Sequence, residues 1–138
     1  MSKVNLASLL KTMVEQDASD LHLTVGVPPE FRIAGKVVKV KSDSLTPQDT
    51  KEVCYSVLTD AQKADFEKHL ELDFSFGIKG LARFRGNLFS QRGSVSGVFR
   101  RVPLIVPDFD QLGLPPILRK IIKRPHGLIL VTGATGSG

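Results

Sequence analysis

A glycine-rich segment at the end of the chain has the residue types and spacing of a phosphate-binding loop. The pattern G-x-x-x-x-G-K-[ST] is matched over its first six positions by Gly133, Ala134, Thr135, Gly136, Ser137 and Gly138. Glycines suit such a loop because its backbone N–H groups turn inward around a phosphate, which leaves little room for a Cβ and requires unusual dihedrals. We therefore expect these six residues to bind nucleotide.

The run before this segment supports the assignment. Leu128 to Thr132 is uninterrupted, apolar and rich in β-branched residues, which is typical of a strand buried on both faces of a parallel sheet. Without that strand, an artificial Gly- and Ser-rich tail would be the better interpretation. The Lys and the Mg²⁺-holding hydroxyl of the pattern would follow Gly138, so we expect a nucleotide-driven protein cut off at its own active site. We also expect the 138-residue chain alone not to hydrolyse ATP.

A second group of chemically capable residues is a cluster of arginines. Residues 1–78 carry 9 Lys and Arg against 12 Asp and Glu, a net charge of −3, whereas residues 79–126 carry 10 against 2, a net charge of +8. Strand alternation places Arg83, Arg85 and Arg100 on one face of a sheet, where a bound anion would relieve their mutual repulsion. A solvated polar face balanced by carboxylates is an equally open interpretation.

Two other chemistries receive less support. Phe84, Phe89 and Phe99 are interleaved with the arginines as in a nucleic-acid stacking platform, but alternation directs Phe84 away from Arg83 and into the core. We therefore expect no nucleic-acid partner. The three histidines are too scattered along the chain to suggest a metal site.

Composition fits one ordinary domain with the stub of a second. No apolar run approaches the roughly 20 residues of a membrane span. The single Cys54 cannot form an internal disulfide and fits a reducing cytoplasm, where we expect it to be a buried apolar residue of a helix.

Periodicity, capping residues and turn residues predict an α+β domain built on an antiparallel sheet with helices on one side. Helices are expected after Asn5, from Pro47 to about Leu58, after Thr59 to about His69, and over 117–123. Strands are expected over 20–25, 31–33, 36–40, 71–78, 82–91 and 94–102. The resulting organisation is a domain over 1–102, a linker over 103–112 and the beginning of an α/β domain over 113–138.

Several stretches together resemble one family. Ser19-Asp-Leu-His-Leu23 with Arg32-Ile-Ala-Gly35, Ala82-Arg-Phe-Arg85 with Gln91-Arg92-Gly93, and Arg124-Pro-His-Gly127 leading into the phosphate loop occur in the order found in type IV pilus retraction ATPases. These are PilT-like members of the secretion ATPase superfamily. The resemblance covers nearly the whole chain.

The resemblance implies a PAS-like N-terminal domain joined to a RecA-like ATPase domain that carries the Walker A loop. It implies ATP and Mg²⁺ as ligands and a cytoplasmic homohexamer at the inner-membrane platform of the pilus machine, where it drives twitching motility. It also implies that Arg83, Arg85 and Arg100 contact nucleotide phosphates. The alternatives are a non-catalytic PAS-like docking module and a related pilus-assembly or secretion ATPase.

Overall fold

The computed structural model describes residues 4–133. Its contacts divide the chain into two compact units, Met1–Leu104 and Ile105–Gly138, and the division falls within the segment predicted to be a linker. The elements of the first unit are α1 (Leu6–Glu15), β1 (Asp20–Leu23), β2 (Glu30–Ile33), β3 (Lys36–Lys39), α2 (Pro47–Tyr55), α3 (Asp60–His69), β4 (Glu71–Ile78), β5 (Ala82–Gln91) and β6 (Ser94–Val102). The described part of the second unit contains one short helix, α4 (Leu118–Ile121).

The three helices of the first unit begin at the predicted caps. The Asn5 side chain accepts a hydrogen bond from the Ser8 backbone N–H, and Thr46 and Thr59 each form a complete capping box. Caps of this kind satisfy backbone N–H groups that have no partner inside the helix. Helix α2 ends at Tyr55, three residues before the predicted end, where the Ser56 hydroxyl donates to the Val53 carbonyl at 2.6 Å.

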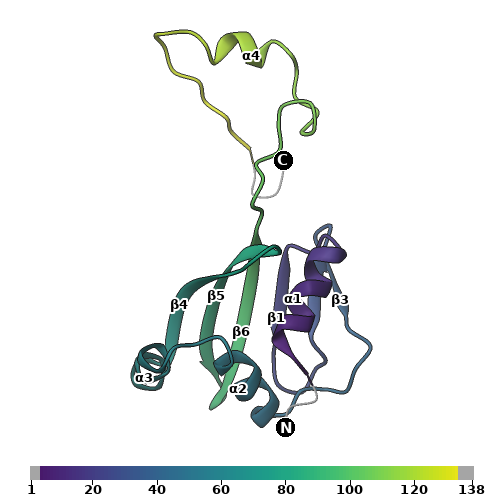
Figure 1. Cartoon of the computed structure of the whole chain (residues 1–138), viewed down its shortest axis with the longest axis vertical. Helices are drawn as coiled ribbons and strands as arrows, with labels where there is room; N and C mark the ends of the chain where they lie inside the picture. The colour runs from purple at the N-terminus through teal and green to yellow at the C-terminus, as the bar shows by residue number, and fades with distance from the viewer. Residues whose placement is uncertain (1–3, 134–138) are drawn as a thin grey trace. The chain divides into compact units, whose positions relative to one another are not determined.

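The six strands form one antiparallel sheet in the order β3-β2-β1-β6-β5-β4 (Figure 1). The predicted bounds of β4, β5 and β6 are confirmed, while β1 ends at Leu23, before the predicted Val25. The β2–β3 and β5–β6 hairpins turn at Ala34-Gly35 and Arg92-Gly93, where all four residues have positive φ. That geometry is typical of type I′ turns, whose twist matches that of the paired strands.

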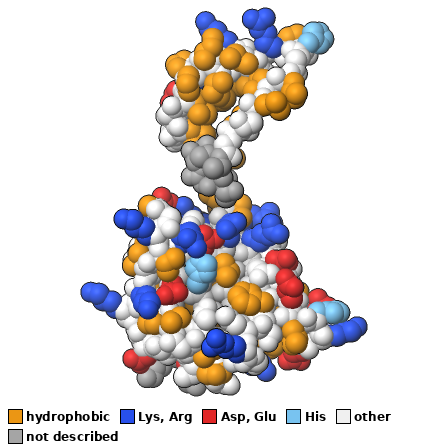
Figure 2. All heavy atoms as spheres, turned by 180° about the vertical axis from the view of Figure 1, so that it is seen from behind, with side chains coloured by type: hydrophobic (Ala, Val, Ile, Leu, Met, Phe, Trp, Pro, Cys, Tyr) orange, Lys and Arg blue, Asp and Glu red, His pale blue; other side chains and the backbone are white. Residues whose placement is uncertain are grey.

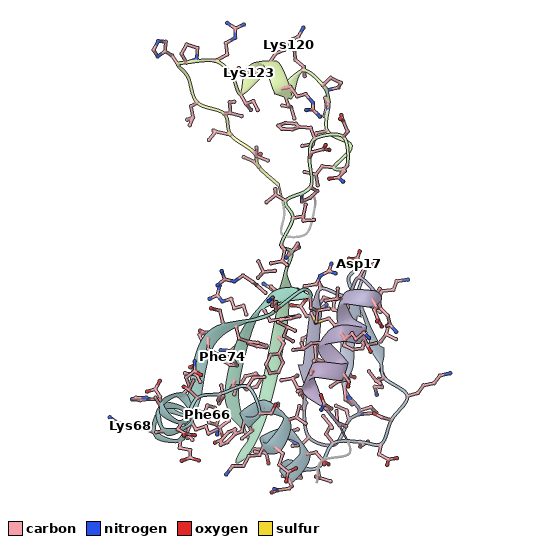
Figure 3. All side chains as sticks on the ribbon, viewed as in Figure 1. Asp17, Phe66, Lys68, Phe74, Lys120 and Lys123 are labelled. Atoms are coloured by element: carbon pink, nitrogen blue, oxygen red, sulfur yellow. The ribbon has the colours of Figure 1, made fainter. Side chains whose placement is uncertain are left out.

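One face of the sheet is covered by the helices, as predicted for an α+β domain (Figure 1). In Figure 3, Phe66 points from α3 toward the sheet whereas Lys68, two residues later, extends to solvent. The core joins helical residues such as Leu10 and Met13 to sheet residues such as Phe84 and Phe99, all of them buried. Cys54 is fully buried on α2, in agreement with the prediction.

The second unit differs from the sequence prediction. Leu128 to Thr132 form no strand and are exposed, with Val131 at 91% of its maximum, so the expected doubly buried strand is absent from the described residues. A parallel strand is stable only between neighbouring strands and covering helices, and residues 105–133 supply no other strand. Helix α4 likewise spans four residues rather than the seven expected over 117–123.

The glycine at position 86 gives a test of core packing. A Cβ on Gly86 would lie 2.5 Å from Cζ of Phe74, a ring enclosed in the core, whereas a Cβ on Gly77 would meet nothing closer than 3.9 Å. Gly86→Ala should therefore lower the free energy of unfolding in urea by about 1–3 kcal/mol. Gly77→Ala, the matched control on β4, should change it by less than about 0.5 kcal/mol. Equal effects of the two substitutions would contradict this description of the core.

Candidate functional site: an arginine row on the open sheet face

The predicted arginines lie on the sheet face that the helices leave uncovered. Arg85 of β5 is directly opposite Arg100 of β6, Arg100 is opposite Asp20 of β1, and Asp20 is opposite Arg32 of β2. Directly opposed residues of antiparallel strands project from the same face. We call this set, Arg32, Asp20, Arg100 and Arg85, the arginine row.

Asp20 is the one acidic member of the arginine row and is nearly inaccessible, with its side chain 5% exposed. Its Oδ1 accepts a hydrogen bond from Nε of Arg100 at 2.9 Å. Its Oδ2 accepts one from the Ser19 hydroxyl at 2.8 Å and lies 3.4 Å from Nε of Arg32. The carboxylate is therefore held on both oxygens, as a buried charge requires.

The ionisation of Asp20 follows from these contacts. Burial alone would raise the pKa of the Asp20 carboxyl, but the hydrogen bonds from Arg100 and Ser19 and the nearby positive charges outweigh burial and hold the pKa below its ordinary value of 3.8. Asp20 is thus a carboxylate at neutral pH. It neutralises one of the three positive charges in the arginine row.

Arg83 and Arg85 are in a different situation from Arg100. Both are exposed, and neither forms an ion pair with a residue in the described range 4–133. A depression of about 500 Å³ lies over β4 and β5, and its lining includes Arg83, Arg85 and one carboxylate, Asp73. Asp73 accepts a hydrogen bond from the Asn87 side chain at 3.1 Å, and the two arginines outnumber it. Figure 2, which views the open face, shows Lys and Arg side chains gathered toward the end of the sheet where β6 ends. This end of the face is suited to binding an anion.

The aromatic residues near the arginines do not form a stacking platform. Phe84 and Phe99 are fully buried on the helix-covered face, as alternation predicted, and only Phe89 lies partly exposed on the open face. Base stacking by interleaved aromatics needs several exposed rings on one surface. Among Phe84, Phe89 and Phe99 that arrangement does not occur.

The other predicted site residues and the single cysteine provide no further site in the described range. Of the predicted phosphate loop, only Gly133 is described, as exposed irregular backbone, and residues 134–138 lie outside the described range. Within residues 4–133, no group of three or more His, Cys, Asp or Glu side chains could hold a metal ion. Burial raises the pKa of the Cys54 thiol to about 12, so this side chain is not a nucleophile at neutral pH.

Sequence reasoning missed two members of the arginine row, Asp20 and Arg32. Alternation places Asp20 on the polar face of β1 together with His22, and this was the available signal. The pairing of β1 with β6 joins residues 80 positions apart, however, and no local pattern indicates it. The sequence therefore identified Arg85 and Arg100, but neither Arg32 nor the carboxylate that fixes Arg100.

No protein-family model matches the chain. The type IV pilus retraction ATPase PilT of Pseudomonas aeruginosa is 40% identical over 135 residues, which are 98% of this chain and 39% of PilT. The pilus ATPase PilU of the same organism is 39% identical over 94% of this chain and 34% of its own length. A crystal structure of the pilus retraction motor PilT with bound ADP superposes with a TM-score of 0.79, at 44% identity, over 99% of this chain and 40% of that one.

Over nearly its whole length the chain is homologous to the PilT-like pilus ATPases. It corresponds to the N-terminal part of PilT-like proteins and spans about two fifths of the length of PilT. The predicted antiparallel α+β fold is confirmed, since the six-stranded sheet with its helices matches the N-terminal domain of the PilT-like proteins. No helix in residues 4–133 is long and apolar enough to cross a membrane.

The contacts of Asp20 predict a specific dependence of stability on pH. Because its pKa is lower in the folded chain than in the unfolded chain, Asp20 stabilises the fold above its ordinary pKa of 3.8, and this contribution is lost as the pH falls through the folded-state pKa. Asp20→Asn should therefore flatten the acid side of the stability profile measured by urea unfolding. Arg100→Gln should act in the same direction, because it removes the strongest of the contacts that lower the pKa. Profiles parallel to that of the wild type would contradict this account.

Proposed function

We propose that the chain is the N-terminal part of a homohexameric motor ATPase that powers type IV pilus retraction and twitching motility. In this proposal ATP is bound and hydrolysed between the present N-terminal domain and a RecA-like domain that begins within 113–138. The similarity to PilT over nearly the entire chain is the observation that carries the proposal.

The arginine row is the contribution of this chain to nucleotide binding. Arg85 and Arg100 are directly opposed like charges, an arrangement that costs free energy unless an anion lies between them. Arg83 is two residues from Arg85 on the same face and is also exposed. Guanidinium groups match phosphate oxygens in shape and charge, so nucleotide phosphates are the expected ligand.

Exposed apolar side chains in the second unit support a further part of the ATPase domain. Ile117, Leu128, Leu130 and Val131 are 54%, 81%, 74% and 91% exposed. Apolar surface of this kind is normally covered by packing. Further strands and helices of a RecA-like domain would supply that cover and would let 128–132 form the predicted buried strand.

The ligands and partners follow from the same proposal. Phosphate contacts to Gly133–Gly138, completed by a following Lys and hydroxyl residue, would hold ATP and Mg²⁺. The assembly would be a homohexamer, cytoplasmic and peripheral to the inner membrane, with the platform proteins of the pilus machine as partners. The residues encoded directly after position 138 separate this proposal from the alternative of a non-catalytic docking module: Lys followed by Ser or Thr supports the motor, and any other pair contradicts it.

The 138-residue chain by itself should not turn over ATP, because the Lys and the metal-holding hydroxyl of the loop pattern are not part of it. Purified chain should release phosphate from ATP at the rate of a buffer blank in a phosphate-release assay. A preparation of Arg85→Ala made in parallel controls for contaminating ATPases. Turnover above that control would contradict the proposed division of the active site between two domains.

Arg85→Ala should weaken the binding of inorganic tripolyphosphate to the chain by about tenfold or more, since a hydrogen bond to a charged group contributes roughly 1.5–3 kcal/mol. Titration calorimetry at low ionic strength measures this change. Arg92→Ala, which removes an exposed arginine from the β5–β6 turn, is the matched control and should change affinity by less than about twofold. Equal losses in the two variants would indicate general charge attraction instead of a site at Arg85.

A further inference from the structure

We infer that Asp20 is a positioning residue for phosphate recognition: it fixes the guanidinium of Arg100 through Nε and leaves the terminal nitrogens of Arg100, beside Arg85, for an anion. This inference rests on the proposed function of the arginine row. It assigns a role to a carboxylate that itself would repel the ligand.

The hydrogen bond between the two residues uses one particular edge of the guanidinium. Nε of Arg100 donates to Oδ1 of Asp20 at 2.9 Å, and the Arg100 side chain nevertheless remains 69% exposed. A guanidinium carries five N–H donors, and this bond occupies one of them. The two terminal nitrogens can still form the paired contact that phosphate oxygens accept.

The carboxylate that holds Arg100 is itself immobilised. Its second oxygen accepts from the Ser19 hydroxyl at 2.8 Å and faces Nε of Arg32 at 3.4 Å. Asp20 also begins β1, whose ladder to β6 includes the Asp20–Arg100 pair. Arg100 is therefore tied to a fixed point, and less of its side-chain freedom is lost when a ligand binds.

The strand register places the terminal nitrogens of Arg100 next to Arg85. Arg85 is opposite Arg100 on β5, and Asp20 is opposite Arg100 on β1, so the carboxylate and Arg85 flank Arg100 on its two sides. Without Asp20, two opposed guanidiniums would repel each other and Arg100 would turn away from Arg85. With Asp20, the pair forms a two-arginine anion site.

A purely electrostatic role of Asp20 and a positioning role predict opposite effects of Asp20→Asn on the affinity for an anion. Asp20→Asn removes a negative charge close to the site, and by Coulomb attraction alone an anion should bind more tightly. If Asp20 positions Arg100, the variant should bind less tightly despite its more positive charge. The sign of the change therefore separates the two mechanisms.

The test is an NMR titration of the full 138-residue chain with inorganic tripolyphosphate, observing the Nε–Hε signals of the arginines. In the wild type, the Arg100 signal should be protected from exchange with water, and Arg85 and Arg100 should both shift on titration. In Asp20→Asn the protection should disappear and the affinity should fall at least about threefold, within the roughly 2- to 12-fold range expected for freeing one long side chain. Glu30→Gln, the matched control, removes a carboxylate from the same face without a contact to Arg100 and should not weaken binding.

The outcomes separate the inference from the proposed function. Normal tripolyphosphate binding in the wild type with unchanged or tighter binding in Asp20→Asn would overturn the positioning role and leave the phosphate role of Arg85 intact. No shift of Arg85 and Arg100 in the wild type would overturn both. If Asp20→Asn fails to fold, Ser19→Ala provides the test, because Ser19 is exposed and its hydroxyl donates the hydrogen bond that orients Asp20. Weaker binding of tripolyphosphate to Ser19→Ala supports the inference, and unchanged binding overturns it.

Discussion

The pairing of β1 with β6 is the interaction on which the rest of this domain depends. It joins the β2–β3 hairpin on one side to the β4–β5–β6 meander on the other, so that two local units become one six-stranded sheet. Its register places Leu21 against Phe99 on the helix-covered face and Asp20 against Arg100 on the open face. The same backbone ladder thus closes the core and assembles the charged site.

The parts of the fold that depend on residues close together in the sequence, such as helix caps and hairpin turns, were predictable. Thr46 and Thr59 begin helices because each side chain accepts a hydrogen bond from the backbone N–H three residues later, and the side chain of that later residue accepts one from the backbone N–H of the Thr. Arg92-Gly93 turns a hairpin because both residues adopt positive φ. The run 128–132 failed as a strand prediction for the converse reason, since an apolar run becomes a strand only when neighbouring strands pair with it. Asp20 was missed because its contact with Arg100 depends on strand order, which alternation does not encode.

The open face combines a fixed arginine with two unpaired ones. Arg100 and its carboxylate form a pair whose geometry is set by the fold, whereas Arg83 and Arg85 have no ion-pair partner in the described range. A site of this composition keeps a net positive charge and still presents one donor group in a defined direction. That combination favours a multiply charged, compact anion over a diffuse acidic surface.

The last residues of β6 bind to residues near the start of β1 on both faces of the sheet. Arg100 bonds Asp20 on the open face, and Arg101 pairs with Asp17 and donates its backbone N–H to the Ser19 carbonyl on the way to Val102. Because β6 lies between β1 and β5, the strand that leads out of the first unit is hydrogen-bonded along both of its edges. Removing β6 from the sheet would therefore break two ladders and separate β1 from β5.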